Sequence, residues 1–288
     1  MISLILATAC SASIALLFKV SSNKNMSREL VTTFNYLSAL VVSAALIVFN
    51  REYNGLALSN RAFDMTLILG ILTGFLFLLS FLLYQESVKK NGASLSGMFA
   101  KLGILVPMII SVIIWKEMPT RLQSVGIVSA LVAIVLVNVK KSGSQVKTYQ
   151  ITLLMALFLA GGFAEFSNKI FQKSEAFNFR PIFLLIIFST AFALSAIILY
   201  FKRKQLVCVW MSIMMGILVG IPNLFSSYFL LDALNRYPAS IVFPTYSAGS
   251  ILLITLISAL FLKEKINPKE QLALGFTAAG LILMNLQL

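Results

Sequence analysis

Residues 181–200 read PIFLLIIFSTAFALSAIILY, a stretch without a single charged side chain. A helix needs about 20 predominantly apolar residues to cross the hydrocarbon core of a bilayer, and this stretch has that length. Similar stretches recur along the whole chain, which is 59% hydrophobic and only 11% charged, with a mean hydropathy of +0.93. A water-soluble core of 288 residues is not built from such a composition. The sequence therefore predicts an all-α integral membrane protein.

Apolar runs of spanning length predict a polytopic protein with ten transmembrane helices. The expected spans lie near residues 2–20, 30–49, 65–85, 93–115, 121–138, 150–172, 179–200, 206–231, 238–262 and 269–286. The connections between them are short and polar, so there is no room for a soluble catalytic or receptor domain. Any function has to lie inside the helical bundle.

The chain also contains an internal repeat, with residues 1–142 as the first five-helix copy and residues 149–288 as the second. The matching positions are Gly70 and Gly74 with Gly216 and Gly220, Ser80 with Ser226, Glu86 with Asp232, Ala93-Ser94 with Ala239-Ser240, Lys116-Glu117 with Lys263-Glu264, and Gly126 with Gly275. Because five spans is an odd number, the second copy enters the membrane from the opposite side. Two inverted halves are a mechanical basis for alternating access around a site near the membrane midplane.

Two motif pairs within these halves resemble a known family. Asn-Gly-Ala-Ser at 91–94 and Trp-Lys-Glu at 115–117 correspond to Tyr-Pro-Ala-Ser at 237–240 and Leu-Lys-Glu at 262–264. The set is similar to the EamA-type branch of the drug/metabolite transporter superfamily, over essentially the whole chain. The resemblance implies a ten-helix inverted-repeat carrier whose fifth and tenth helices are peripheral, and it names no substrate. One departure is that Pro107 and Pro244 do not align, so we expect the fourth and ninth helices to bend at different depths.

Several kinds of chemistry are excluded or weakened by the residue counts. The chain has no histidine, which removes His-based triads, zinc motifs and the commonest proton shuttle. Cys10 and Cys208 lie too far apart in the sequence to indicate a redox or metal motif. The net charge of +13 is scattered between apolar runs, which indicates anchoring at lipid head groups rather than nucleic-acid binding. We expect no enzyme activity, no cofactor and no metal.

Two ionisable residues stand out among those within predicted spans, where each costs roughly 3 kcal/mol and is a functional candidate by default. Lys101 lies on the fourth helix and Glu165 in the middle of the sixth. Glu165 could bind a proton or cation, a role that the resemblance to small multidrug transporters also implies. Lys101 could bind a carboxylate or phosphate. The structural alternative is that the two charges neutralise each other, or that Glu165 pairs with Lys169 at i,i+4, and only fix the packing.

Other polar residues within the spans are further candidates for substrate contact. Asn168 and Lys169 share a polar stripe with Glu165. The others we select are Asn35, Tyr84, Asn223 and Tyr246. Each would also serve as a hydrogen bond between helices, and for any single one that is the more ordinary role.

These observations favour a secondary active transporter, with export as its direction, for an amino acid or another zwitterionic or amphipathic metabolite. One alternative is a proton-coupled exporter of organic cations. An alternative from another class of protein is a membrane scaffold that transports nothing. The expected partners are a small molecule, the lipid bilayer and protons as a coupling ion, with a monomer or homodimer in a bacterial cytoplasmic membrane.

Loops after odd-numbered spans carry thirteen Lys or Arg against seven in the others, which predicts both termini outside. The resemblance implies both inside, and the orientation stays open.

Overall fold

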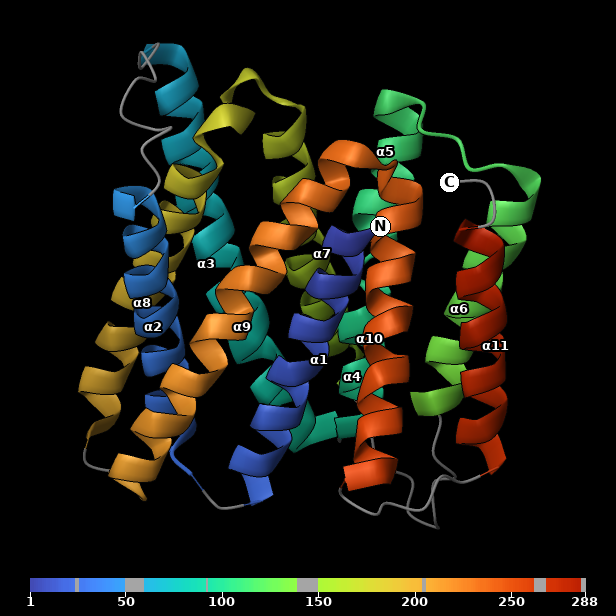
Figure 1. The fold of residues 1–288 in the computed structure, drawn as a ribbon. Helices are drawn as coiled ribbons and strands as arrows, with labels where there is room; N and C mark the ends of the chain where they lie inside the picture. The colour runs from blue at the N-terminus through green and yellow to red at the C-terminus, as the bar shows by residue number, and fades with distance from the viewer. Residues whose placement is uncertain are drawn as a thin grey trace. The chain divides into compact units, whose positions relative to one another are not determined.

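The computed structural model describes residues 1–23, 26–49, 60–91, 93–138, 150–203, 206–261 and 268–285, and every regular element in these is a helix. The helices are shown in chain order in Figure 1. They are α1 (Ile2–Asn23), α2 (Arg28–Phe49), α3 (Asn60–Asn91), α4 (Ala93–Leu102), α5 (Leu105–Trp115), α6 (Arg121–Asn138), α7 (Ile151–Lys173), the short 3-10 helix η2 (Glu175–Phe179), α8 (Arg180–Lys202), α9 (Val209–Arg236), α10 (Ala239–Phe261) and α11 (Pro268–Asn285).

The predicted polytopic fold of ten spans is confirmed. In the described part of the chain, six helices are long and apolar enough to cross a membrane, and four shorter apolar stretches accompany them. One predicted span differs, because residues 93–115 form two helices, α4 and α5, instead of one. Two others extend further than their apolar part, since α3 continues to Asn91 and α9 to Arg236.

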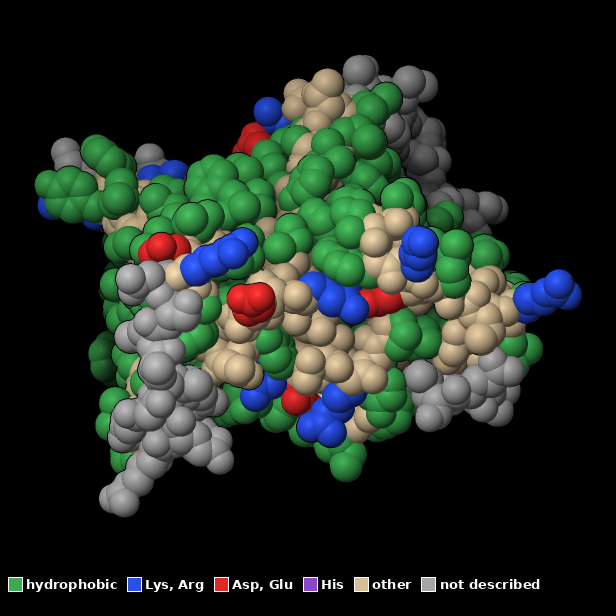
Figure 2. Space-filling model, turned by 90° about the horizontal axis from the view of Figure 1, so that it is seen from above, with side chains coloured by type: hydrophobic (Ala, Val, Ile, Leu, Met, Phe, Trp, Pro, Cys, Tyr) green, Lys and Arg blue, Asp and Glu red, His purple; other side chains and the backbone are tan. Residues whose placement is uncertain are grey.

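Large apolar side chains are exposed along many of these helices, as expected where lipid replaces water. Val48 and Phe49 of α2, Ile113 of α5 and Phe201 of α8 each expose more than 70% of their surface. Figure 2 shows the molecule from above, where Lys, Arg, Asp and Glu side chains lie among the hydrophobic ones. Exposed apolar area on this scale marks a surface that contacts lipid.

Contacts between backbone positions divide the chain into two compact units. Unit 1 comprises Met1–Leu78 and Ser167–Asp232, and unit 2 comprises Leu79–Phe166 and Ala233–Leu288. Each unit therefore takes helices from both predicted repeats, and the boundaries fall within α3, α7 and α9. The units do not coincide with the sequence halves 1–142 and 149–288, which remain a prediction about duplication.

In unit 1 the matched glycine pairs serve as close contacts between the repeats. A Cβ on Gly74 of α3 would lie 2.5 Å from the carbonyl oxygen of Ile187 in α8. A Cβ on Gly220 of α9 would lie 2.4 Å from the carbonyl oxygen of Asn35 in α2. The third helix of one sequence half thus packs on the second helix of the other, and the reverse. Small residues allow this backbone approach in a membrane.

In unit 2 the corresponding close contact joins α6 and α11, which lie side by side (Figure 1). A Cβ on Gly126 would lie 2.8 Å from the carbonyl oxygen of Gly280, and the reciprocal distance is also 2.8 Å. The buried residues Ile127, Ala130, Ile241, Ala248 and Met284 join α6 and α11 to α10 in one apolar cluster. This cluster fixes α10, which carries part of the candidate site.

Candidate functional site

A break between α4 and α5 is the local feature around which the candidate site is built. Pro107 has no backbone N–H, and in a continuous helix its ring would clash with the carbonyl group four residues earlier, at Gly103. Accordingly α4 ends at Leu102 and α5 begins at Leu105. The N–H of Val106 donates to the carbonyl oxygen of Gly103 at 3.0 Å. This hydrogen bond spans three residues, as in a 3-10 helix, instead of the four of an α-helix.

Helix α7 crosses this break at very short range. A Cβ on Gly162 would lie 2.6 Å from Cγ2 of Val106 and 2.7 Å from the carbonyl oxygen of Gly103. A Cβ on Gly103 would lie 3.0 Å from the carbonyl oxygen of Phe158. Two glycines therefore bring the backbone of α7 against the interrupted helix, and they place Glu165, three residues after Gly162, near the break.

Lys101 lies in the last turn of α4, directly before the break. Its ammonium Nζ donates to the hydroxyl Oγ of Ser250 in α10 at 3.2 Å. That hydroxyl donates in turn to the carbonyl oxygen of Ser247 at 2.8 Å. The carboxyl end of a helix carries a partial negative charge, so it is a favourable place for a lysine ammonium.

The charge of Glu165 acts on Lys101, so unit 2 brings together the two charged candidates predicted from the sequence. Both side chains are partly exposed, whereas Ser250 is fully buried. The arrangement is a neutral pair of opposite charges beside an interrupted helix, with a serine hydroxyl as its third member. Half-helices whose ends face a charged ligand are a recurring way of building transporter sites.

The other predicted residues are placed as follows. Asn168 and Lys169, also on α7, are each only 1% exposed. In unit 1 the side-chain amide of Asn223 donates to Oδ1 of Asn35 at 3.0 Å, joining α9 to α2. Tyr84 of α3 and Tyr246 of α10 are both partly exposed. For all of these residues, contact with substrate stays a prediction.

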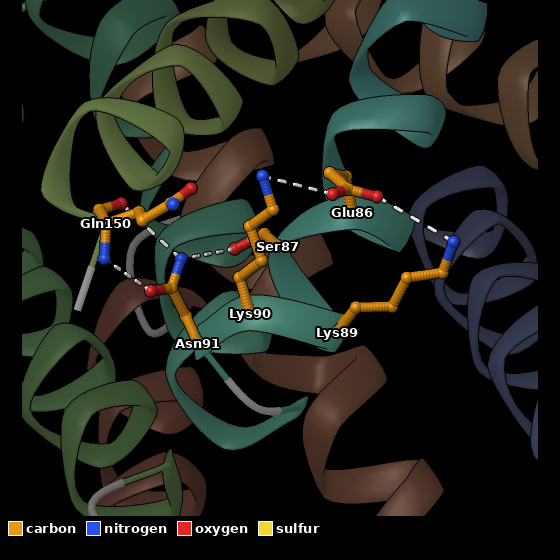
Figure 3. Close-up of polar contacts among 6 residues, drawn as sticks. All are labelled: Glu86, Ser87, Lys89, Lys90, Asn91 and Gln150. Carbon is orange, nitrogen blue, oxygen red and sulfur yellow. Dashed lines mark hydrogen bonds and ion pairs between the residues drawn. The ribbon is translucent and has the colours of Figure 1, made fainter. Parts of the chain in front are cut away.

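Sequence reasoning missed the contribution of Asn91, the last residue of α3 (Figure 3). Its Oδ1 accepts the backbone N–H of Gln150 at 2.7 Å, and its Nδ2 donates to the carbonyl oxygen of Gln150 at 3.4 Å and to Oγ of Ser87 at 3.3 Å. Gln150 immediately precedes α7 and accepts the first hydrogen bonds of that helix. Asn91 therefore fixes the start of the helix that carries Glu165. Its place in the Asn-Gly-Ala-Ser motif was the available signal.

The charged residues at the span ends have different partners. As expected for an ordinary surface charge, Glu86 pairs with Lys89 and Lys90, at 3.7 Å and 3.2 Å (Figure 3). Asp232 accepts from Arg180 at 3.3 Å and from the hydroxyl of Ser3. Glu264, which matches Glu117 in the second half of the sequence, lies outside the described residues.

Glu117 has a more specific contact, because its carboxylate accepts the backbone N–H of Ala239 at 2.6 Å. Ala239 is the first residue of α10. A glutamate at the end of a span is ordinarily solvated or paired with a neighbouring lysine, and this contact to a helix N–H is of another kind.

Comparisons with known proteins agree with the fold and with the transport class. An uncharacterized protein of Haemophilus influenzae is 26% identical over 287 residues, 96% of this chain and 95% of the relative. A protein of known crystal structure has a TM-score of 0.78 at 16% sequence identity, with 99% of this chain and 96% of the other covered, which shows the shared fold. Residues 1–139, which lie within the predicted first repeat, match the EamA-like transporter family. Through this match the chain is similar to the EamA-like transporter family, and this similarity together with the described helices indicates a multi-pass membrane transporter.

Proposed function

We propose that this transporter is a secondary carrier that exports a small zwitterionic metabolite, such as an amino acid, across a bacterial cytoplasmic membrane by alternating access. The observation that carries the proposal is the electrostatic interaction of Lys101 with Glu165 beside the break between α4 and α5. Charged groups at such a depth are costly, by roughly 3 kcal/mol each, unless they compensate one another or a ligand. One positive and one negative side chain together match the two charges of an amino acid.

In the proposed bound state, Lys101 pairs with the substrate carboxylate and Glu165 with the substrate ammonium. Ser250 keeps the lysine ammonium at the end of α4, since its hydroxyl accepts from Nζ at 3.2 Å. Without substrate the two side chains compensate each other, so the site is stable in both conditions. A largely apolar surrounding strengthens each of these pairings relative to water.

Export of organic cations coupled to protons is a second candidate, favoured by the partial exposure of Glu165 on α7. In that case Glu165 binds either the cation or a proton, and Lys101, held by Ser250, is structural. The two candidates predict different selectivity for ligands that differ only in charge.

Three ligands with the same hydrocarbon part separate these candidates: leucine, isoamylamine, which lacks the carboxylate, and 4-methylpentanoate, which lacks the amine. We expect uptake into proteoliposomes to be most efficient for leucine. Lys101→Met should raise the KM for leucine at least about 30-fold, the usual cost of removing one partner of a desolvated charge pair, and should spare isoamylamine. Glu165→Gln should impair leucine and isoamylamine and remove any dependence of uptake on a pH gradient.

Matched controls are Lys90→Met and Glu86→Gln, because these residues form an exposed ion pair at the end of α3. Both should transport leucine as the wild type does. An unchanged KM for leucine in Lys101→Met would reject the zwitterion site. If isoamylamine were the best ligand and its uptake survived Lys101→Met, cation export would be the function.

A further inference from the structure

We infer that Glu117 is a positioning residue for the Lys101 site, because it sets the position of α10 and thereby of Ser250. The inference rests on the proposed function for its effect on substrate, but the contact itself is independent of any ligand. The carboxylate of Glu117 accepts the N–H of Ala239 at 2.6 Å. The first N–H groups of a helix lack internal partners and carry partial positive charge, so a carboxylate binds strongly there.

Helix α10 has no capping side chain of its own at this end. The residue before Ala239 is Pro238, which accepts the first hydrogen bonds of the helix through its carbonyl oxygen but carries no polar side chain. The hydroxyl of the next residue, Ser240, is buried and has no hydrogen-bond partner among the described residues. The cap is supplied instead by Glu117, from the segment that follows α5.

The backbone conformation after α5 places Glu117 next to the start of α10. Helix α5 ends at Trp115, and Lys116 adopts the left-handed conformation with φ 53° and ψ 32°, which terminates the helix. The ring of Trp115 lies 6.1 Å from that of Phe166 in α7, centroid to centroid. The end of α5 is therefore held on α7 by an aromatic contact and on α10 by the carboxylate.

Two polar contacts now tie α10 to the broken helix, one at each end of α5. The Lys101–Ser250 hydrogen bond precedes the start of α5, and the Glu117–Ala239 hydrogen bond follows its end. Ser250 lies three turns beyond Ala239, about 16 Å along α10 at 1.5 Å per residue, so α10 runs antiparallel to α5 between the two contacts. A shift of α10 along its axis would lengthen a hydrogen bond that is already 3.2 Å long. The distant glutamate thus controls whether Ser250 reaches Lys101.

The direct test of the contact is amide hydrogen exchange of the full-length transporter, followed in the peptide that contains the first turn of α10. Glu117→Ala should accelerate exchange there, and Glu117→Gln, which keeps an oxygen acceptor without the charge, should give a smaller effect. Glu86→Ala is the matched control, because Glu86 pairs with lysines on its own helix. Unchanged exchange in both Glu117 variants would overturn the inference.

The test of positioning is a double-mutant cycle with Glu117→Gln and Ser250→Ala. Leucine uptake should show a KM raised about tenfold by Glu117→Gln, the typical effect of one weakened polar contact, with little change in the maximal rate. Ser250→Ala should then add little in the Glu117→Gln background. Additive effects would mean that Glu117 caps α10 without positioning Ser250, and would overturn the inference.

The same comparison can be made without substrate. The melting temperatures of the wild type, the two single variants and the double variant are measured by thermal unfolding. If Lys101→Met leaves the KM for leucine unchanged, the proposed function fails. The melting temperatures still decide the inference, since non-additive shifts support coupling between Glu117 and Ser250 and additive shifts refute it.

Discussion

At the scale of single residues, the site depends on glycines at close helix contacts as well as on charged side chains. Lys101 and Glu165 are predictable from the sequence, because an ionisable side chain within an apolar span needs a reason to be there. Ser250 is not predictable, because it looks like any small polar residue of an apolar helix. Its contact with Lys101 joins residues 149 positions apart and exists only through the packing of α10.

Two adjacent glycines on α7 provide a sharp test at this scale. Gly162→Ala places a Cβ 2.6 Å from Val106 and 2.7 Å from the carbonyl oxygen of Gly103, so α7 has to move away from the break. We expect a loss of about 1–3 kcal/mol in the free energy of unfolding. Measurement by unfolding in increasing SDS, with ligand binding in parallel, checks this.

The neighbouring variant Gly161→Ala is its control. The nearest atom to that Cβ is Oγ of Ser80 at 3.4 Å, which is an ordinary contact. Alanine is also favoured over glycine within a helix by about 0.5–1 kcal/mol, so this variant should be as stable as the wild type or more so. Equal stability losses for the two variants would contradict the close approach of α7 to the break.

At the scale of helices, hydropathy identifies the apolar part of a span but not where the helix ends. Helix α3 continues beyond its apolar part to Asn91, and the ion pair of Glu86 with Lys90 at i,i+4 supports this last segment. The bend expected from Pro107 is present as a complete interruption, because Gly103 and α7 meet there. Pro244, by contrast, lies within the continuous helix α10.

The start of α7 should depend on the end of α3. Asn91→Ala removes the acceptor for the N–H of Gln150, and we expect a loss of about 1–2 kcal/mol in the free energy of unfolding. Asn91→Asp keeps an acceptor oxygen and should lose less. Thermal unfolding of the purified variants measures both, with Lys90→Ala as a control that leaves the melting temperature unchanged because its ion pair is exposed. A wild-type melting temperature in Asn91→Ala would show that α7 starts independently of α3.

At the scale of the whole molecule, the sequence predicts ten spans because lipid imposes a length and a polarity on each of them. It does not predict the two compact units, since these follow from contacts between helices far apart in the chain. Gly74 and Gly220 are an intermediate case. Their repetition was visible in the sequence, but their partners on α8 and α2 were not.

The orientation in the membrane can be decided with a native residue. Cys208 is exposed and directly precedes α9, beside the basic residues Lys202 and Arg203. The family resemblance implies termini in the cytoplasm, which places this segment outside. We therefore expect a membrane-impermeant maleimide to label Cys208 in intact cells.

Cys208→Ala should abolish this labelling, which excludes a signal from Cys10. Protection of Cys208 in intact cells, with labelling only after the membrane is opened, would instead support the orientation predicted by the loop charges.

The pairing of Lys101 with Glu165 also bears on the energetics of the transport cycle. One ammonium and one carboxylate sum to zero, and an amino acid bound between them adds no net charge. Moving a single elementary charge through a membrane potential of 100 mV changes its free energy by about 2.3 kcal/mol, whereas a zwitterion in a neutral site experiences no such term. If no ion moves with the substrate, a carrier built in this way is insensitive to the membrane voltage, and the substrate concentrations alone set its direction.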